Sequence, residues 1–261
     1  MPAAFVWITT LQNRSIIGSI VGSSLLLPMS VSEGLLKNDG TTMPARVIAI
    51  GDIHGCARAF ETLLGVVQPT DDDLIVPLGD YVDRGPDSRG VIDRLLDLEK
   101  YTSVRPLLGN HEEMMLDVIE GREAADFWLR YGGVQTLDSY GFAGDYSAIP
   151  EVHMDFLRRC LNYYETDEHF FVHANYHHQV PLSETGSELL RWRSLADSMP
   201  GEHHNGKVAV VGHTPDQFGE IMDVGFLKCI DTFCYGGMWL TAMDVLTGEF
   251  WQANENGIVR D

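Results

Sequence analysis

Short, largely apolar runs that end at a glycine recur along this chain, and they constrain its fold more than any other feature. They stand at residues 46–50, 74–78 and 104–108. Such runs predict buried β-strands, because a strand covered on both faces is apolar at nearly every position. Segments with apolar residues at helical spacing stand at residues 57–67, 91–98, 112–119 and 127–140. This alternation predicts an α/β protein with buried sheets and helices outside.

The second half of the chain is predicted to consist mainly of strands. Apolar runs of strand length stand at residues 169–173, 208–211, 226–230, 239–245 and 249–252. No internal repeat, low-complexity tract or obvious linker interrupts residues 43–261. We therefore expect a single compact domain over that range.

Residues 1–42 differ from the rest of the chain. Their few acidic and basic residues cancel, so the whole net charge of −20 falls in residues 43–261. The apolar stretch at 16–31 is broken by glycine, serine and proline, and it is shorter than the roughly 20 residues that span a bilayer. Three interpretations remain open: a cleaved secretory signal, a membrane anchor, or a flexible extension upstream of Met43. We expect no stable membrane span and no part in the chemistry from this leader.

Composition and charge exclude several classes of protein. With 44% hydrophobic and 21% charged residues, the 261-residue chain is neither disordered nor fibrous. Its acidic surface disfavours nucleic acid and anionic lipid as partners, because both are bound mainly through cationic side chains. Four cysteines without a CxxC pair favour buried thiols. We therefore expect the protein to be located in the cytoplasm, or in the periplasm or extracellular space if the leader acts as a signal.

Five short segments each follow a strand-like run and carry side chains that can bind metals. They are residues 51–55 (Gly-Asp-Ile-His-Gly), 79–85 (Gly-Asp-Tyr-Val-Asp-Arg-Gly), 109–112 (Gly-Asn-His-Glu), 172–174 (Val-His-Ala) and 212–214 (Gly-His-Thr). One such segment alone could be an ordinary turn or the start of a helix. Strand-end loops of an open α/β sheet converge on one crevice, so the five together predict a shared site.

The residue types in these segments suit two divalent cations. Carboxylates and imidazoles bind manganese, iron, zinc or magnesium, and one carboxylate can bridge two ions. Asp52 and His54 stand two apart and can face one ion, and Asp80 is the natural bridge. The absence of thiolates from the set argues against a structural zinc site. The second ion would be completed by neutral ligands, namely Asn110, His173 and His213.

These motifs resemble those of the phosphoprotein phosphatases, a family of calcineurin-like metallophosphoesterases, over about residues 47–251. The similarity is greatest to the short bacterial and phage-type serine/threonine phosphatases. It extends to His-Glu-Glu-Met-Met at 111–115, to Trp-Leu-Arg-Tyr-Gly-Gly at 128–133 and to the tail at 230–237. The resemblance implies a four-layer α/β/β/α fold, with two mixed β-sheets sandwiched between helices. It also implies that residues 43–261 are the catalytic domain.

The resemblance implies the same two metal ions, with manganese favoured, and it assigns roles to further residues. His111, oriented by Asp83, would be the general acid, and Arg84 and Asn110 would bind the phosphate. The metal pair would lower the pKa of a water between them, and the resulting hydroxide would attack phosphorus in line. His111 would then protonate the departing alkoxide.

The family has a second phosphate-binding arginine, which in this chain would be Arg191 or Arg193; we favour Arg193. Tyr235 stands outside the five motifs, and we expect it to fill the core or a groove.

The activity implied is that of a protein phosphatase acting on phosphoserine, phosphothreonine or also phosphotyrosine. The expected partner is a phosphoprotein or phosphopeptide, and the oligomeric state is open. The alternative is a symmetrical dinucleoside tetraphosphatase. That branch tends to replace the acid at the position of Asp83, to carry Asp in place of Glu112, and to insert a long segment before its last histidine. A scaffold without turnover is disfavoured, because every implied catalytic position holds a competent residue.

Overall fold

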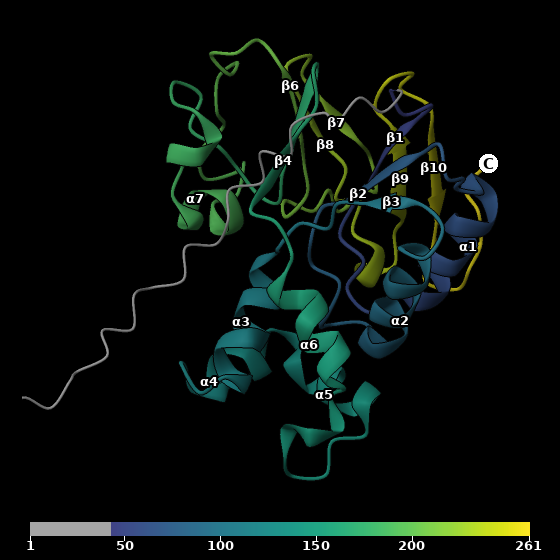
Figure 1. The fold of residues 1–261 in the computed structure, drawn as a ribbon, viewed down its shortest axis with the longest axis vertical. Coiled ribbons are helices and arrows are strands. Elements are labelled where there is room, and N and C mark those ends of the chain that lie inside the picture. The colour runs from purple at the N-terminus through teal and green to yellow at the C-terminus, as the bar shows by residue number, and fades with distance from the viewer. Residues whose placement is uncertain (1–42) are drawn as a thin grey trace, which may run out of the picture. The chain divides into compact units, whose positions relative to one another are not determined.

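The computed structural model describes residues 43–261, which form two five-stranded mixed sheets with helices outside them (Figure 1). This is the predicted architecture of two mixed sheets between helices. The leader at 1–42 lies outside the described residues, so the interpretations of that segment and the domain boundary at residue 43 stay predictions.

The first sheet has β1 (Val47–Ile50) at its centre, in the strand order β10-β9-β1-β2-β3. β1, β2 and β3 run parallel, and β9 and β10 run antiparallel to their neighbours. Ile50 pairs with Pro77, so β1 and β2 end side by side at the same edge. The other strands are β2 (Leu74–Pro77), β3 (Ser103–Val104), β9 (Leu240–Asp244) and β10 (Phe250–Ala253).

The second sheet has the order β4-β5-β6-β8-β7, with β5, β6 and β8 parallel and the two outer strands antiparallel. Its parallel strands also end at one edge, where polar loops follow each of them. The strands are β4 (Tyr163–Glu165), β5 (His169–Val172), β6 (Val208–Val211), β7 (Met222–Asp223) and β8 (Leu227–Cys229).

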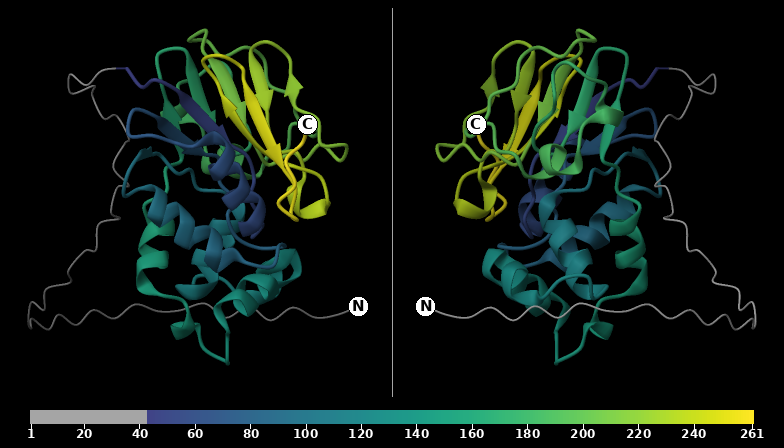
Figure 2. Two further views of the ribbon diagram at one scale, coloured as in Figure 1. Left: turned by 90° about the vertical axis from the view of Figure 1, so that its right-hand side faces the viewer. Right: turned by 90° about the vertical axis from the view of Figure 1, so that its left-hand side faces the viewer.

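Helices α3 to α6 gather at one end of this domain, below the sheets in Figure 1, and Figure 2 shows the same separation from two further sides. Residues of α1, α2, α3, α5 and α6 share an apolar core with the outer face of the first sheet. The helices are α1 (Ala57–Val67), α2 (Ser88–Leu98), α3 (Asn110–Ile119), α4 (Ala125–Trp128), α5 (Val134–Tyr140), α6 (Glu151–Arg158) and α7 (Ser187–Trp192).

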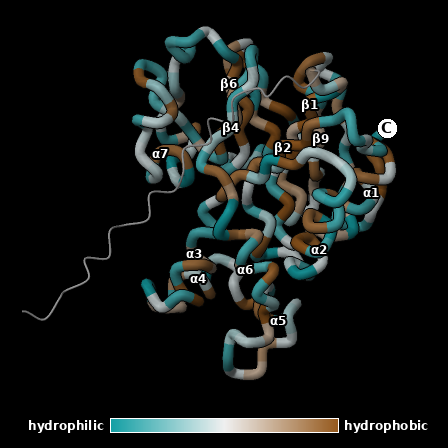
Figure 3. Tube along the Cα trace, in the orientation of Figure 1, coloured by the Kyte–Doolittle hydropathy of each residue, from teal (hydrophilic) through white to brown (hydrophobic). Residues whose placement is uncertain are grey.

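Alternating side chains along the central strands build three apolar layers. In β1, Ile48 and Ile50 face the helices, whereas Val47 and Ala49 face the second sheet. In β5, Phe171 faces the first sheet, whereas its neighbours on the strand face α7 and the loops beside it. Because both faces are covered, the strands are apolar throughout, and the tube in Figure 3 is brown along much of β1 and β2.

Phe171 fills the layer between the sheets, so its truncation should cost stability. Its side chain is fully buried there. We expect Phe171→Ala to lower the free energy of unfolding by about 3–5 kcal/mol, because it removes buried apolar surface and leaves a cavity. Urea denaturation measures the loss. Phe250→Ala, at a position that is 51% exposed, is the matched control and should change stability by less than about 1 kcal/mol.

The helix predicted over residues 127–140 is interrupted in the structure. α4 passes into a π-helical turn, Leu129–Gly133, before α5 begins. Gly132 has φ +116°, which a continuing α-helix cannot accommodate. The prediction of a mainly β second half missed α6 and α7, and the strand predicted at 104–108 is limited to β3.

All four cysteines are buried and unpaired, as predicted. Within residues 43–261 no helix combines the length and the apolar character needed to cross a membrane.

Candidate metal centre

Loops that follow four strands, together with the first turn of α3, bring the five sequence motifs to one place. The side chains come from both sheets, at the edges where the parallel strands end. They are Asp52 and His54 after β1, Asp80 after β2, Asn110 and His111 at α3, His173 after β5 and His213 after β6.

Backbone hydrogen bonds tie these loops to one another. The N–H groups of Ile53 and His54 donate to the carbonyl of Asp80 at 3.0 and 2.7 Å, which joins the loops after β1 and β2. The N–H of Gly212 donates to the carbonyl of His173 at 2.8 Å, which joins the loops after β5 and β6. The side chains are therefore carried by fixed backbone.

Glu112 attaches the loop after β2 to the start of α3. Its buried carboxylate accepts the N–H groups of Tyr81 at 2.7 Å and Val82 at 3.2 Å. It also accepts those of Asp80 at 2.8 Å and Gly109 at 3.0 Å. A carboxylate in the first turn of a helix is favoured by the helix dipole. Glu112 thus sets the distance between Asp80 and α3.

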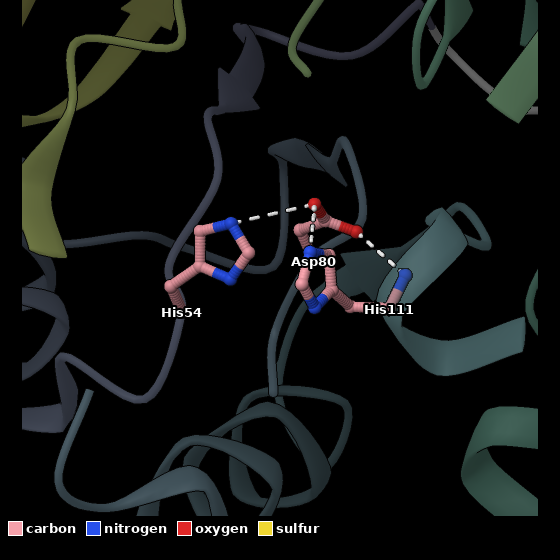
Figure 4. Close-up of side chains that lie close together, drawn as sticks. All are labelled: His54, Asp80 and His111. Atoms are coloured by element: carbon pink, nitrogen blue, oxygen red, sulfur yellow. Dashed lines mark hydrogen bonds and ion pairs between the residues drawn. The ribbon is translucent and has the colours of Figure 1, made fainter. Parts of the chain in front are cut away.

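Asp80 lies at the centre of the site (Figure 4). One oxygen, Oδ2, is 3.4 Å from His54 Nε2, and the other, Oδ1, is 3.4 Å from His173 Nε2. Oδ1 also accepts the backbone N–H of His111 at 3.1 Å. Two groups of possible metal ligands share this carboxylate: His54, Asp80 and His111 form one, and Asp80, His173 and His213 form the other. Asp80 is thus placed to bridge two ions.

Three imidazoles around Asp80 are held in one tautomer by backbone carbonyls, and each turns its other nitrogen toward the site. Burial, the largest effect, lowers the pKa of all three, that of His213 to about 4, so they are neutral at pH 7. Neutral imidazoles oriented in this way fit divalent transition metals. The contacts are His54 Nδ1 with Val82 at 2.9 Å, His173 Nδ1 with Leu78 at 2.8 Å, and His213 Nε2 with Trp192 at 3.1 Å.

Asn110 adds an amide oxygen to the second group. Its Oδ1 is 3.0 Å from His173 Nε2 and 3.0 Å from His213 Nδ1, the two nitrogens that face the site. Three ligand atoms of different residues thus converge with the Asp80 carboxylate.

Asp52 lies beside these groups rather than within either of them. Its carboxylate accepts the backbone N–H of His213 at 3.0 and 3.2 Å. Burial and the neighbouring carboxyl of Asp231 raise the pKa of Asp52, and burial raises that of Asp231 to about 7. Asp231 follows β8 and was not predicted as a site residue, although its position directly after a buried strand matches that of the five motifs.

His111 and Asp83 form a buried pair next to Asp80. His111 Nδ1 is 2.7 Å from Asp83 Oδ2. The same carboxylate accepts the indole N–H of Trp128 at 3.0 Å and the hydroxyl of Thr136 at 2.7 Å. Burial opposes protonation of the imidazole, but Asp80 and Asp83 outweigh it and raise the pKa of His111. His111 is therefore oriented, and its Nε2 points away from Asp83.

Arg84 and Tyr235 occupy the side of the site next to His111. Arg84 Nη2 lies 3.0 Å from His111 Nε2, and Nη1 donates to the Tyr235 hydroxyl. The guanidinium also lies over the Tyr235 ring, 4.4 Å from its centroid, and that ring meets the His54 ring edge-on at 4.7 Å. Tyr235 was predicted to fill the core or a groove; it is partly buried and packs against the core, and it also contacts two site residues.

Neither Arg191 nor Arg193 is among the groups around Asp80. Arg193 is paired with Glu188, and its side chain is 45% exposed. Arg191 is buried, bonds to Glu113 and Asn162, and is close enough to lower the pKa of His173. The preference for Arg193 stays a prediction, and its ion pair with Glu188 does not favour it.

Left-handed backbone is concentrated in these loops. Seven residues other than glycine have positive φ within residues 43–261, and five of them belong to the site. Such conformations cost non-glycine residues free energy and are found preferentially at functional sites. The five are His54 (φ 44°), Asp80 (51°), Asp83 (71°), Arg84 (69°) and His213 (62°).

A family model described as calcineurin-like phosphoesterase matches residues 45–237. The chain belongs to this family. The matched residues include all five motifs and run from the start of β1 to the loop after β8. The family is one of metal-dependent phosphoesterases, and the buried histidine and aspartate groups of this chain could hold divalent metals.

Curated relatives of this phosphoesterase have two different activities. It is 50% identical over 74 residues to the symmetrical bis(5'-nucleosyl)-tetraphosphatase of Acidovorax sp. (strain JS42), a match that covers 28% of this chain and 25% of that protein. It is 41% identical over 88 residues to serine/threonine-protein phosphatase 1 of Salmonella typhimurium, covering 33% of this chain and 38% of that protein. The matched segments thus span well under half of either relative.

Solved structures support the fold. A protein described provisionally as a diadenosine tetraphosphatase has a TM-score of 0.62 and 24% identity, covering 82% of this chain and 96% of that chain. A cold-active protein-tyrosine phosphatase of a psychrophilic Shewanella species has a TM-score of 0.60 and 17% identity, covering 82% and 79%. At this identity the likeness concerns the arrangement of sheets and helices.

Proposed function

We propose that this phosphoesterase is a protein phosphatase that removes phosphate from serine or threonine side chains. The observation that carries the proposal is the buried pair of His111 and Asp83, joined at 2.7 Å beside the metal-ligand groups. The dinucleoside tetraphosphatase branch tends to lack the acid at this position, so its presence here, with Trp128 and Thr136 as two further hydrogen-bond donors to it, favours the protein phosphatase branch.

The proposed metal ligands divide into two sets that share Asp80. When bound, two divalent cations, with manganese proposed, activate water and offset the negative charge of the phosphoryl oxygens. The neutral, preoriented imidazoles fit this task because metal binding then requires no deprotonation of histidine. The first proposed set is Asp52, His54 and Asp80, of which Asp52 lies beside the group that the structure brings together, and the second is Asp80, Asn110, His173 and His213.

His111 would donate a proton to the alkoxide that leaves phosphorus. Its Nδ1 is held by Asp83, which leaves Nε2 as the nitrogen that can carry this proton. A nearby carboxylate stabilises the protonated ring, which agrees with the raised pKa of His111. Asp83 acts through His111 and is a positioning residue.

Arg84 would bind the phosphate through two N–H groups of its guanidinium. In the structure one of these groups, on Nη2, donates to His111 Nε2. Binding of phosphate would replace that hydrogen bond and leave His111 Nε2 free to act on the substrate. Tyr235 stays in contact with the other side of the guanidinium and limits its movement.

A second candidate, a symmetrical dinucleoside tetraphosphatase, is favoured by a different observation. The 50% identity to the Acidovorax enzyme is higher than that to the Salmonella protein phosphatase, although each match covers a minority of the chain. Both activities would use the same metal ligands, so the substrate assay has to separate them.

We expect metal-stripped protein supplied with manganese to hydrolyse a phosphoserine peptide at least tenfold faster, in kcat/KM, than diadenosine tetraphosphate. That ratio corresponds to about 1.4 kcal/mol of transition-state discrimination. Phosphate release measures the first reaction, and chromatography of the nucleotide products measures the second. A tenfold preference for the dinucleotide would reverse the substrate choice.

A further inference from the structure

A hollow of about 620 Å³ opens beside Arg84, and the proposed hydrolysis assigns no role to it. Its lining includes two cationic side chains, two tyrosines and an amide. They are Arg84, Arg130, Tyr131, Gln135 and Tyr235. Because Arg84 and Tyr235 also belong to the site, a substrate bound there would extend directly into this hollow.

The wall of the hollow is the π-helical turn Leu129–Gly133, which is tied to the site at two points. The carbonyl of Gly132 accepts the backbone N–H of Arg84 at 3.4 Å, and a Cβ at Gly132 would lie 2.5 Å from that nitrogen. Before the turn, Trp128 donates to the carboxylate of Asp83 at 3.0 Å. Arg130 and Tyr131 therefore stand on backbone fixed relative to the catalytic residues.

Neither cationic side chain of this hollow forms an ion pair with a carboxylate, although Arg84 lies close enough to Asp52 and Asp231 to lower the pKa of both. Most lysines and arginines of residues 43–261 form ion pairs with Asp or Glu, as expected on a chain of net charge −20. Four arginines in that range form none: Arg58, Arg84, Arg105 and Arg130. Arg84 and Arg130 line the same hollow. The Arg130 side chain donates one hydrogen bond, from Nε to the carbonyl of Asp126. A bound anion would complement the positive charges of Arg84 and Arg130.

We propose that the hollow binds a second anionic group of the substrate, carried next to the phosphate that is cleaved, and that Arg130 recognises it. The inference rests on the proposed hydrolysis at the neighbouring site. A carboxylate or a further phosphate has the required chemistry, since a guanidinium binds either through two parallel hydrogen bonds. The tyrosines and Gln135 add hydrogen-bonding groups beside it. Arg130 determines specificity and does not take part in the cleavage step.

The test compares Arg130→Gln with wild type on substrates that differ in their second anion. The substrates are p-nitrophenyl phosphate, two phosphoserine peptides that differ by Glu or Gln next to the phosphoserine, and diadenosine tetraphosphate. We expect Arg130→Gln to lower kcat/KM by about 10- to 100-fold for the substrate with the matching second anion, the cost of one lost charged hydrogen bond pair. Turnover of p-nitrophenyl phosphate should stay within about twofold.

The pattern of losses identifies the anion. A loss confined to the Glu peptide indicates a carboxylate, and a loss confined to the dinucleotide indicates a phosphate; either supports the proposal. Arg58→Gln removes the same charge from an arginine of α1 that also lacks an acidic partner, and it should leave all four rates unchanged. Thermal unfolding of both variants should match wild type, since Arg130 is exposed.

Equal rates for wild type and Arg130→Gln on every substrate would overturn the inference and leave the proposed function standing. An equal loss on p-nitrophenyl phosphate would also overturn it, because that substrate has no second anion. If wild type with manganese hydrolyses none of the four substrates, the proposed function fails, and the inference falls with it.

Discussion

Replacing His111 with asparagine should lower kcat toward a phosphoserine peptide by about 10²- to 10⁴-fold, the usual contribution of a positioned general acid. His111 Nε2 is the nitrogen left free by the bond to Asp83, and an asparagine side chain cannot supply its proton. The loss should be at least tenfold smaller for p-nitrophenyl phosphate, because p-nitrophenolate leaves without needing a proton. Steady-state kinetics on both substrates gives the comparison.

The difference between the two substrates is what identifies an acid. A variant that loses the same factor on both would mean that His111 positions or binds rather than protonates. His204→Asn is the matched control, since His204 is exposed and lies outside the site. Its rates on both substrates should equal those of wild type.

The second large effect is expected from Asp80→Asn. Asp80 lies within 3.4 Å of two imidazoles and is shared by both groups of possible metal ligands, so the variant weakens both metal positions together. We expect turnover to fall by on the order of 10³-fold or more, because metal ions contribute several kcal/mol to such transition states. Isothermal titration with manganese should show weakened binding.

A readout independent of turnover comes from stability. Ligands that bind only the folded state raise the melting temperature, so manganese should stabilise wild type and leave Asp80→Asn almost unchanged. Asp97→Asn, an exposed position on α2, is the control and should respond to manganese as wild type does. A normal manganese response in Asp80→Asn would contradict the central place given to this carboxylate.

Much of the fold could be predicted because its central strands are short and apolar and alternate with segments of helical spacing. The helix at Ala57–Val67 and the strand at Val208–Val211 have the predicted bounds. The prediction failed where distant contacts decide the backbone. The break in the helix at 127–140 depends on Gly132 packing against Arg84, about 50 residues earlier in the chain, and local periodicity carries no sign of that contact.

The candidate site shows the same division. Its motif residues stand out in the sequence because each lies shortly after a strand-like run, within a short polar segment. Tyr235 could not, because its importance comes from what it touches, namely Arg84. Asp231, which lies beside Asp52, was missed although it follows a buried strand as the motif residues do. Both follow β8, and only the pairing of β8 with β6 brings this segment next to the other loops.

The five left-handed residues of the site cost backbone free energy in order to keep their side chains in the site. Each one keeps a side chain where glycine would be relaxed, at a cost of about 1 kcal/mol or more. The neighbouring positions Gly55, Gly79 and Gly85 already hold the glycines that the loops allow, and a Cβ at any of them would clash. Glycine at His54, Asp80 or Asp83 would relieve that backbone cost but would remove a side chain of the site, and at Asp80 and Asp83 it would also leave buried donors without an acceptor. Directed evolution of this scaffold has to screen for catalysis in every round.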